Sequence, residues 1–377
     1  MTTLCVVVYL EDEMWRLPNT TLETLNVSAW TSSSLLDKAY LQLSNEHDDD
    51  LETYNNSKSY RFEMINFPTT LQYLKLKFND KPDQESSFTA HLPDDLSQLH
   101  TLILTTIQLP HGILPNINSI ITIDLGDMIL NILPEPCEQL KSLTLEYVSK
   151  SDSMPYDIPE SYISLSDLYL NDAMINSVPE LLPIEVLSLY HTGIMVPPAC
   201  SSLKEMTLYD EQNLTNLSDK TTRLQILTLC EVPIKEISQN NLSEIKIQDN
   251  VSIESISTNI YAHFDTLFIH HNVSSINENL LLSTYKLKEL YLSEIELNWE
   301  KINVLRNLNI DYLIIRDGCR LPNLPDNPSL RQIVLSKIKI KSSWMSNLSN
   351  RFLGTIVCGL LFKLRKIRRL MIGRIFH

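Results

Sequence analysis

The chain contains few of the residue patterns that perform catalysis. It has no glycine-rich phosphate loop, no GxGxxG fingerprint, no HExxH zinc motif and no GxSxG elbow. His270 and His271 are the one adjacent histidine pair. Neighbouring strand residues point to opposite faces, so these two are poorly placed to share a metal. We therefore expect no enzymatic activity, no cofactor, no metal site and no small-molecule substrate.

Six separate cysteines indicate a reducing compartment. They form no CxxC pair and no regular spacing, and they are Cys5, Cys137, Cys200, Cys230, Cys319 and Cys358. Isolated cysteines near apolar segments usually behave as small buried hydrophobic residues. The first residues, Met-Thr-Thr-Leu-Cys, carry no basic charge and do not read as a signal peptide. We expect a cytoplasmic location.

Two groups of aromatic residues, flanked mainly by acids, have the composition of a protein-binding hot spot. The candidate residues are Tyr169, Tyr190, Tyr209, Asp167, Glu205, Phe268, Tyr291, Tyr312 and Arg316. They recur at fixed places in a repeated apolar pattern, which must therefore position them. The alternative is that neighbouring aromatic residues only cover one another along a sheet.

The repeated pattern is clearest between residues 165 and 208. Three segments of the form LxxLxL begin at Leu165, Ile184 and Leu203, with a constant step of 19 residues. A unit of this size cannot bury its own apolar face and must stack on its neighbours. Fourteen such segments occur, and from Leu71 onward they begin 18 to 28 residues apart. They begin at residues 22, 71, 99, 120, 140, 165, 184, 203, 224, 242, 264, 287, 310 and 330.

Each segment predicts a short strand, because its last two apolar residues alternate with outward residues. Strands of adjacent units then pair in parallel. Many return segments contain an apolar residue followed by proline, as in Leu109-Pro110 and Val178-Pro179. Proline suits extended or 3₁₀ backbone and not a full helix.

This pattern resembles the leucine-rich repeat family over residues 17–340. The resemblance implies an α/β-type solenoid shaped as a horseshoe, with a parallel sheet on its concave face and mostly extended, 3₁₀ or short helical convex segments. The family's usual asparagine, the last position of LxxLxLxxN, is present here only as Asn79, Asn250 and Asn272. The solenoid should therefore be irregular. A local likeness to an F-box at Leu182-Pro183-Ile184 is in register with the repeats on both sides.

Charge divides the chain unevenly. The net charge is −15, but residues 342–377 contain seven basic residues and no acid, so the first 341 residues carry −22. The acidic body argues against nucleic acid and favours basic or neutral protein partners. The basic residues of the tail include Lys363, Arg365, Lys366, Arg368 and Arg369. The tail reads either as a cap of the solenoid or as an amphipathic segment for a membrane surface.

These features predict three regions and one function. Residues 1–16 would be an N-terminal edge or partial repeat, residues 17–340 the solenoid with a polar insertion at 44–60, and residues 341–377 the basic cap or amphipathic segment. We expect a non-enzymatic scaffold whose concave face binds a protein. Two alternatives remain: a membrane-peripheral adaptor anchored by the tail, and a substrate-recognition subunit of a ubiquitin ligase.

Overall fold

A computed structural model gives the fold of the chain. It describes residues 3–9, 24–30, 59–63, 71–79, 87–92, 96–115, 117–135, 137–238, 241–249, 251, 255–256, 266–270, 287–293, 310–316, 331–335 and 356–358. These residues fall into two compact units, 1–206 and 207–377, and the boundary lies inside β11 (Glu205–Tyr209).

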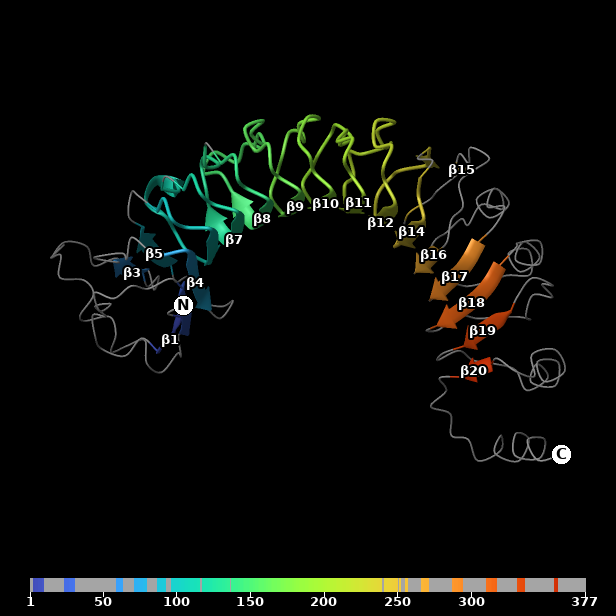
Figure 1. The fold of residues 1–377 in the computed structure, drawn as a ribbon, viewed down its shortest axis with the longest axis horizontal. Coiled ribbons are helices and arrows are strands. Elements are labelled where there is room, and N and C mark those ends of the chain that lie inside the picture. Colours follow the sequence, from blue (N-terminus) through green and yellow to red (C-terminus); the bar gives the residue numbers. More distant parts are fainter. Residues whose placement is uncertain are drawn as a thin grey trace, which may run out of the picture. The chain divides into compact units, whose positions relative to one another are not determined.

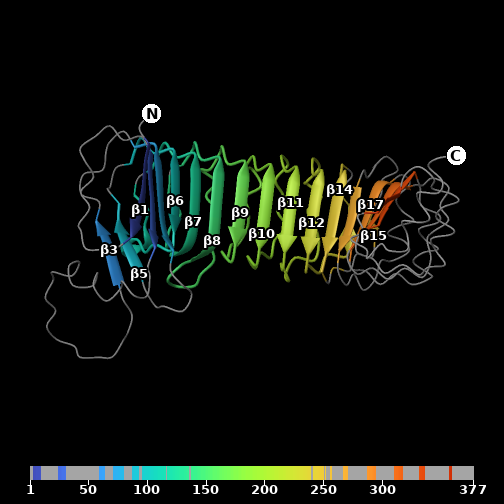
Figure 2. The same ribbon diagram turned by 90° about the horizontal axis from the view of Figure 1, so that it is seen from below.

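Parallel strands form the first unit. They are β1 (Thr3–Tyr9), β2 (Thr24–Trp30), β4 (Tyr73–Asn79), β6 (Thr101–Thr105), β7 (Thr122–Ile129), β8 (Ser142–Ser149), β9 (Asp167–Asn171) and β10 (Val186–Tyr190), and they pair in that order. A second, two-stranded parallel sheet joins β3 (Ser59–Glu63) to β5 (Ser87–His91). Strands β6 to β10 lie side by side with their arrows in one direction (Figure 2).

The second unit repeats this arrangement. Its main strands pair in the order β12 (Ile226–Cys230), β14 (Glu244–Gln248), β16 (Thr266–His270), β17 (Leu287–Ser293), β18 (Ile310–Arg316), β19 (Gln332–Leu335) and β20 (Ile356–Cys358). Two short strands, β13 (Glu236–Ile237) and β15 (Ser255–Ile256), form a second parallel pair. In each unit one strand and its return segment make one coil, so each unit is a parallel β-solenoid.

The leucine pattern explains why these segments are strands. Along β10 the residues alternate between half-buried and buried, and Leu187 and Leu189 are both fully buried. They stand in register with Leu168 and Leu170 of β9. The first apolar residue of each repeat, such as Ile184, is buried as well. Three apolar side chains of each coil therefore fill the interior, as the repeat spacing predicts.

The return segments are extended or turn-like (Figure 1). Within the described ranges the only helical element is the short 3₁₀ turn η1 (Pro110–Gly112), and no α-helix occurs. Successive return segments meet through single parallel bridges, Ile113 to Ile132 and Tyr156 to Ile175. The helical part of the predicted α/β class is thus missing from the described residues. Coils of about 20 residues that carry prolines leave little length for a helix.

Two local predictions can be compared with the fold. The segment that resembles an F-box lies in the solenoid: Leu182 and Ile184 are buried, and the amide of Leu182 donates to the carbonyl of Pro179 over 3.3 Å. It leads directly into β10 and builds no helical bundle. In the tail, β20 pairs in parallel with β19, with Ile356 opposite Ile333. That pairing is what a further repeat would make.

Other predicted segments lie outside the described residues. These are the polar insertion 44–60, apart from its last two residues in β3, and the basic tail residues Lys363, Arg365, Lys366, Arg368 and Arg369. In the part of the chain that is described, no helix is long and apolar enough to cross a membrane.

Candidate functional site

The outward residues of the first unit form three rows, because the parallel strands pair in register. From β6 to β10, the first row holds Thr101, Thr122, Ser142, Asp167 and Val186. The middle row holds Ile103, Asp124, Thr144, Tyr169 and Ser188. The last row holds Thr105, Gly126, Glu146, Asn171 and Tyr190. These rows make one continuous outward face opposite the leucine core.

Tyrosines gather where β8, β9 and β10 meet. The ring centroids of Tyr169 and Tyr190 are 5.3 Å apart, and their planes are tilted by 37°. Burial raises the pKa of the Tyr169 hydroxyl first, and Tyr190, Glu146 and Tyr147 raise it further. Glu146 and Tyr190 stand in the same row on either side of Asn171, and Tyr147 follows Glu146 in the chain. We call Tyr147, Tyr169, Tyr190 and Glu146 the tyrosine patch.

Acidic side chains surround the patch. Asp167 and Glu146 are exposed, and the Asn171 amide donates to Glu146 Oε1 over 3.3 Å. Asp124 lies half-buried in the middle row. Burial and then Glu146 raise the pKa of Asp124, while Lys75 and Lys77 of β4 lower it. The outward face of β7 to β9 is therefore electronegative.

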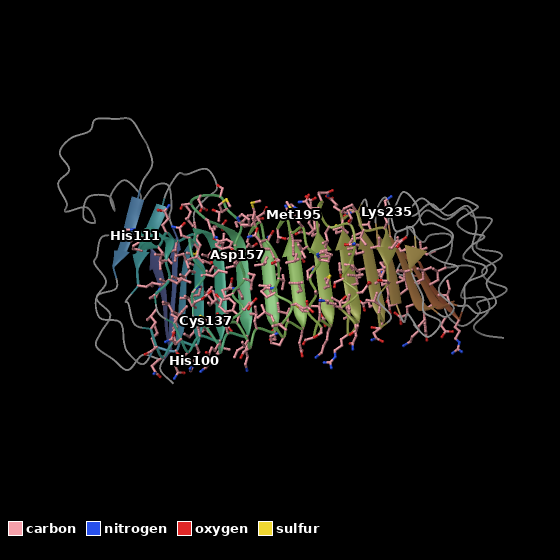
Figure 3. All side chains as sticks on the ribbon, turned by 90° about the horizontal axis from the view of Figure 1, so that it is seen from above. His100, His111, Cys137, Asp157, Met195 and Lys235 are labelled. Carbon is pink, nitrogen blue, oxygen red and sulfur yellow. The ribbon has the colours of Figure 1, made fainter. Side chains whose placement is uncertain are left out.

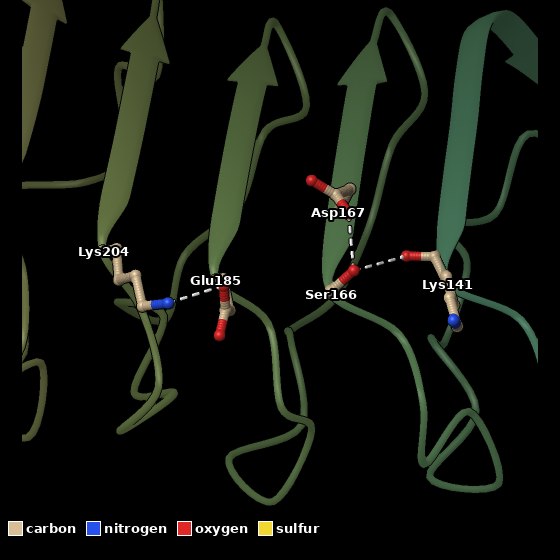
Figure 4. Close-up of polar contacts among 5 residues, drawn as sticks. All are labelled: Lys141, Ser166, Asp167, Glu185 and Lys204. Atoms are coloured by element: carbon tan, nitrogen blue, oxygen red, sulfur yellow. Dashed lines mark hydrogen bonds and ion pairs between the residues drawn. The ribbon is translucent and has the colours of Figure 1, made fainter.

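Polar contacts fix the residues at the start of the strands. Ser166 Oγ donates to Asp167 Oδ2 over 2.5 Å and also contacts the Lys141 carbonyl oxygen at 3.2 Å, as Figure 4 shows. One strand further, Lys204 Nζ lies 2.7 Å from Glu185 Oε2. The predicted site residue Glu205 follows Lys204, is exposed, and donates its amide to the Glu185 carbonyl over 3.0 Å. Asp167 and Glu205 thus lie on the same edge of the face.

A row of left-handed residues lies near the ends of the strands, inside β7 and β8 and just beyond β6, β9 and β10. In eight coils this is the second residue after the last leucine-type position, and the φ angles there lie between 25° and 58°. In the first unit the residues are Thr106, Asp127, Tyr147, Asp172 and His191, and in the second Asp210, Glu231 and Asp249. The amide of Asp172 donates to the Tyr190 carbonyl of the next coil over 2.9 Å. The turn therefore keeps the coils hydrogen-bonded where the strands end.

The second aromatic group lies on the second unit. Phe268 and Tyr291 stack with centroids 4.1 Å apart and planes at 19°. Lys246 Nζ lies 5.5 Å from the Phe268 ring centroid and 2.6 Å from Glu244 Oε1. The structure therefore brings two of the three predicted aromatic residues together and adds a lysine to them.

The remaining predicted residues of that group lie around the stacked pair. The Tyr291 hydroxyl donates to Glu289 Oε2 over 3.1 Å. Burial and then this contact raise the pKa of Tyr291, while the charge of Arg316 lowers it. Tyr312 stands in register with Glu289 and not with Tyr291, so it belongs to a different row.

Tyr209 belongs to the second unit, whereas Tyr169 and Tyr190 belong to the first. The charges of Cys230 and then Glu231 raise the pKa of the Tyr209 hydroxyl. The sequence grouped the three tyrosines because they recur from repeat to repeat. The described contacts join Tyr169 to Tyr190 and place Tyr209 beside a buried thiol and an acid.

Three cysteines in the described part of the chain are buried, protonated thiols. Cys137, Cys200 and Cys230 are all free and no more than 2% exposed. Burial is the main cause that raises the pKa of Cys137 and Cys200 to about 11 and that of Cys230 to about 12. A thiol in this state is a poor nucleophile. Among the described residues no group of three metal-ligating side chains comes together.

These thiols predict how stability changes in alkali. Below pH 9 a cysteine is neutral in the folded and the unfolded chain, and its contribution to stability is fully present. Between pH 9 and about 11, Cys200 ionises only in the unfolded chain, so the free energy of unfolding falls as pH rises. Urea midpoints measured from pH 8 to 11 should therefore decline less steeply for Cys200→Ala than for the wild type. Equal slopes would contradict the assignment.

The predicted residues Tyr169, Tyr190, Asp167 and Glu205 lie on outward positions of the first unit, and Tyr209, Phe268, Tyr291, Tyr312 and Arg316 lie on outward positions of the second. Reasoning from sequence missed Tyr147 and Glu146, which complete the tyrosine patch. Tyr147 lies just beyond the repeated pattern, in the left-handed row. The signal for that row was the recurrence of aspartate at one place: Asp127, Asp172, Asp210 and Asp249.

Some polar and apolar side chains lie along the edges of the first unit, away from its outward face. In Figure 3, His111 and Met195 lie toward one edge of the first unit and His100 toward the opposite edge. Met195 and Leu181 are largely exposed apolar residues of the return segments. Exposed apolar residues also occur in the neighbouring return segments, at Ile113, Ile132, Met154, Met174 and Val196.

Comparison with known proteins gives no relative from which a function could be transferred: no protein-family model matches the chain, and neither does any curated protein.

Proposed function

We propose that this chain is a non-enzymatic protein-binding scaffold of the leucine-rich repeat type, with the outward face of its strands as the concave binding surface of a horseshoe. The main support for this proposal is that core-facing and outward-facing residues alternate along each strand. Leu187 and Leu189 of β10 fill the core, while Tyr190 on the same strand joins Tyr169 on the outward face. Binding residues can therefore vary without disturbing the fold.

A rigid sheet suits this role energetically. Backbone hydrogen bonds on both sides of each strand hold the sheet rigid. The side chains on it therefore lose less conformational freedom when a partner binds. Tyrosines add large contact area with few rotatable bonds, and they are enriched in binding hot spots. The tyrosine patch combines both properties with an acidic surround. These features favour a protein partner with basic or neutral chemistry and disfavour nucleic acid.

A cytoplasmic location is part of the proposal. Its support is that Cys137, Cys200 and Cys230 are separate buried thiols. The membrane-peripheral alternative depends on tail residues outside the described ranges and stays a prediction, as does the ubiquitin-ligase alternative. Flotation with liposomes, with and without residues 351–377, tests the membrane anchor directly.

The test of the proposed function is a pair of double variants. Tyr169→Ala with Tyr190→Ala removes the paired rings, and Thr144→Ala with Ser188→Ala changes the two half-buried residues that flank Tyr169 in the middle row. Affinity purification with mass spectrometry should identify a partner with the wild type and with the control. The tyrosine variant should lose that partner, while its free energy of unfolding changes by no more than about 1.5 kcal/mol.

The opposite pattern would show that the tyrosines are structural. In that case the tyrosine variant would unfold much more easily but would still retain the partner. Thermal unfolding of both double variants, recorded by circular dichroism, separates the two outcomes.

A further inference from the structure

We propose that the tyrosine patch receives a cationic side chain of the partner, arginine in particular, against its rings and the Glu146 carboxylate, while Asp167 at the start of β9 adds to the negative charge of this face. The inference rests on the proposed function, because it names the chemistry that this part of the outward face recognises. The partner segment would be a basic stretch of polypeptide.

The patch offers aromatic surface to a cation. Tyr147 is 52% exposed, and Tyr169 and Tyr190 are each partly exposed. The two inner rings are tilted by 37° with centroids 5.3 Å apart, so they do not cover each other as a parallel stack would. Ring faces carry the negative side of the aromatic quadrupole and attract cations within about 6 Å.

The strands that carry the patch hold charge of one sign, and the nearest lysines of the outward rows, Lys75 and Lys77, lie on β4. Strands β6 to β10 contain four acids and neither lysine nor arginine. Within the described residues, no ion pair joins Glu146 or Asp167, whose hydrogen-bond partners are the neutral Asn171 and Ser166. The carboxylates therefore favour a positive group from outside.

Two lysines near the patch in sequence, Lys204 and Lys150, make contacts elsewhere, and the exposed Lys141 precedes β8 at the end of the strand opposite Glu146. Lys204 pairs with Glu185 at 2.7 Å. Lys150 donates to the Pro155 carbonyl over 3.0 Å and lies 5.1 Å from the Tyr156 ring centroid, among the return segments. Neither contact leads to the tyrosine patch.

The chain itself builds this kind of cation site in its second unit. Lys246 Nζ lies over the Phe268 ring at 5.5 Å and against Glu244 at 2.6 Å. There the ring and the acid lie on the outward face of neighbouring strands, and the chain supplies the cation. In the tyrosine patch the rings and the acids are present on β8, β9 and β10, and those strands contain no cation.

Tyr147 adds an independent argument, because its position costs stability. Its φ of 53° places it in the left-handed region, where a bulky side chain is unfavourable and aspartate or asparagine is better tolerated. Asp127 and Asp172 occupy the same position in the coils on either side. Tyr147 is thus both strained and about half exposed, and strained residues of this kind cluster at functional sites.

Arginine fits this surface better than lysine. The planar guanidinium can stack on a tyrosine ring and at the same time donate two hydrogen bonds to one carboxylate. Lysine presents one compact, strongly hydrated ammonium group. The patch has both ring faces and carboxylates, so it favours the planar group.

The test uses dye-labelled nonapeptides in fluorescence anisotropy with the full chain. One peptide alternates arginine and serine, and its matched control replaces every arginine by citrulline, which has nearly the same shape and no charge. We expect the citrulline peptide to bind at least about tenfold more weakly, which corresponds to about 1.4 kcal/mol. The affinity for the arginine peptide should fall as salt is added.

Variants locate the site. Glu146→Gln with Asp167→Asn should weaken the arginine peptide about tenfold. Glu138→Gln with Glu160→Gln makes the same change in net charge at two exposed positions of the return segments, and it should leave affinity within about twofold. Tyr147→Asn should weaken binding several-fold while its melting temperature stays equal or rises, an outcome that a purely structural tyrosine would not give.

Three results would overturn the inference: no binding of the arginine peptide, equal affinity for the citrulline peptide, or equal losses in the two charge variants. The proposed function fails separately. If Tyr169→Ala with Tyr190→Ala loses the native partner while arginine and citrulline peptides bind alike, the face is a binding surface without a cation site. If that variant retains the partner, the face is not the binding surface.

Discussion

Leu187→Ala should lower the free energy of unfolding by about 3 to 5 kcal/mol. The Leu187 side chain is fully buried and stands in register with Leu168 of the preceding coil. Each coil of a solenoid contacts only its neighbours, so little material is available to fill the cavity that the alanine leaves. Urea unfolding followed by circular dichroism measures the loss.

The next residue along the strand provides the control. Ser188 is half-buried on the outward face, so Ser188→Ala should change the free energy of unfolding by no more than about 0.5 kcal/mol. Similar losses for Leu187→Ala and Ser188→Ala would mean that the strand does not alternate between core and surface as described.

Tyr162→Ala should have a comparable effect, about 3 to 5 kcal/mol, through a different part of the coil. Tyr162 is fully buried in a return segment, and its hydroxyl donates to the Pro134 carbonyl over 2.8 Å. Burial is the main cause that raises the pKa of this hydroxyl, so it remains a hydrogen-bond donor at neutral pH. The side chain thus connects two return segments by packing and by a hydrogen bond.

A smaller substitution separates these contributions. Tyr162→Phe keeps the ring but leaves the Pro134 carbonyl without this donor, and it should cost about 1 to 3 kcal/mol. Ile163→Ala, at the exposed neighbouring residue, should cost no more than about 0.5 kcal/mol. If Tyr162→Phe proved as stable as the wild type in urea, the hydrogen bond would have no net stabilising effect.

Much of the fold follows from the spacing of leucine-type residues. The segment Leu165 to Leu170 predicts a strand because its last two leucines must point inward together, and β9 begins and ends within two residues of that core. A constant step of 19 residues then predicts that β9 and β10 pair in register, as Leu168 and Leu187 do. Periodicity suffices here because core and surface alternate strictly.

The turn at the end of each strand could not be predicted with the same ease. A left-handed backbone at Thr106 or Tyr147 goes against the preference of those residues and is imposed by the coil. The sequence signal for it is weak, since aspartate is also common at ordinary surfaces. Tyr147 was therefore missed, although it completes the tyrosine patch.

The grouping of the aromatic residues also depended on geometry. Recurrence along the sequence places Tyr291 and Tyr312 in consecutive repeats, but one belongs to the middle row of its unit and the other stands beside Glu289. A shift of two residues along a strand moves a side chain by about 7 Å, which is enough to separate two rings. Two aromatic residues of neighbouring repeats therefore contact each other only when they stand in the same row of the sheet.

The outward rows exist only because the coils stack in parallel and in register. An engineered disulfide tests this stacking directly. Thr122→Cys with Ser142→Cys places thiols on residues that pair across β7 and β8, whose backbones should be about 5 Å apart. Thr122→Cys with Thr144→Cys joins the same strands two residues out of register, at about 8 Å, which is beyond disulfide reach.

Mild oxidation followed by peptide mapping should show a rapid cross-link in the first variant and almost none in the second. A dominant link in the out-of-register variant would contradict the parallel stacking and the binding face that depends on it.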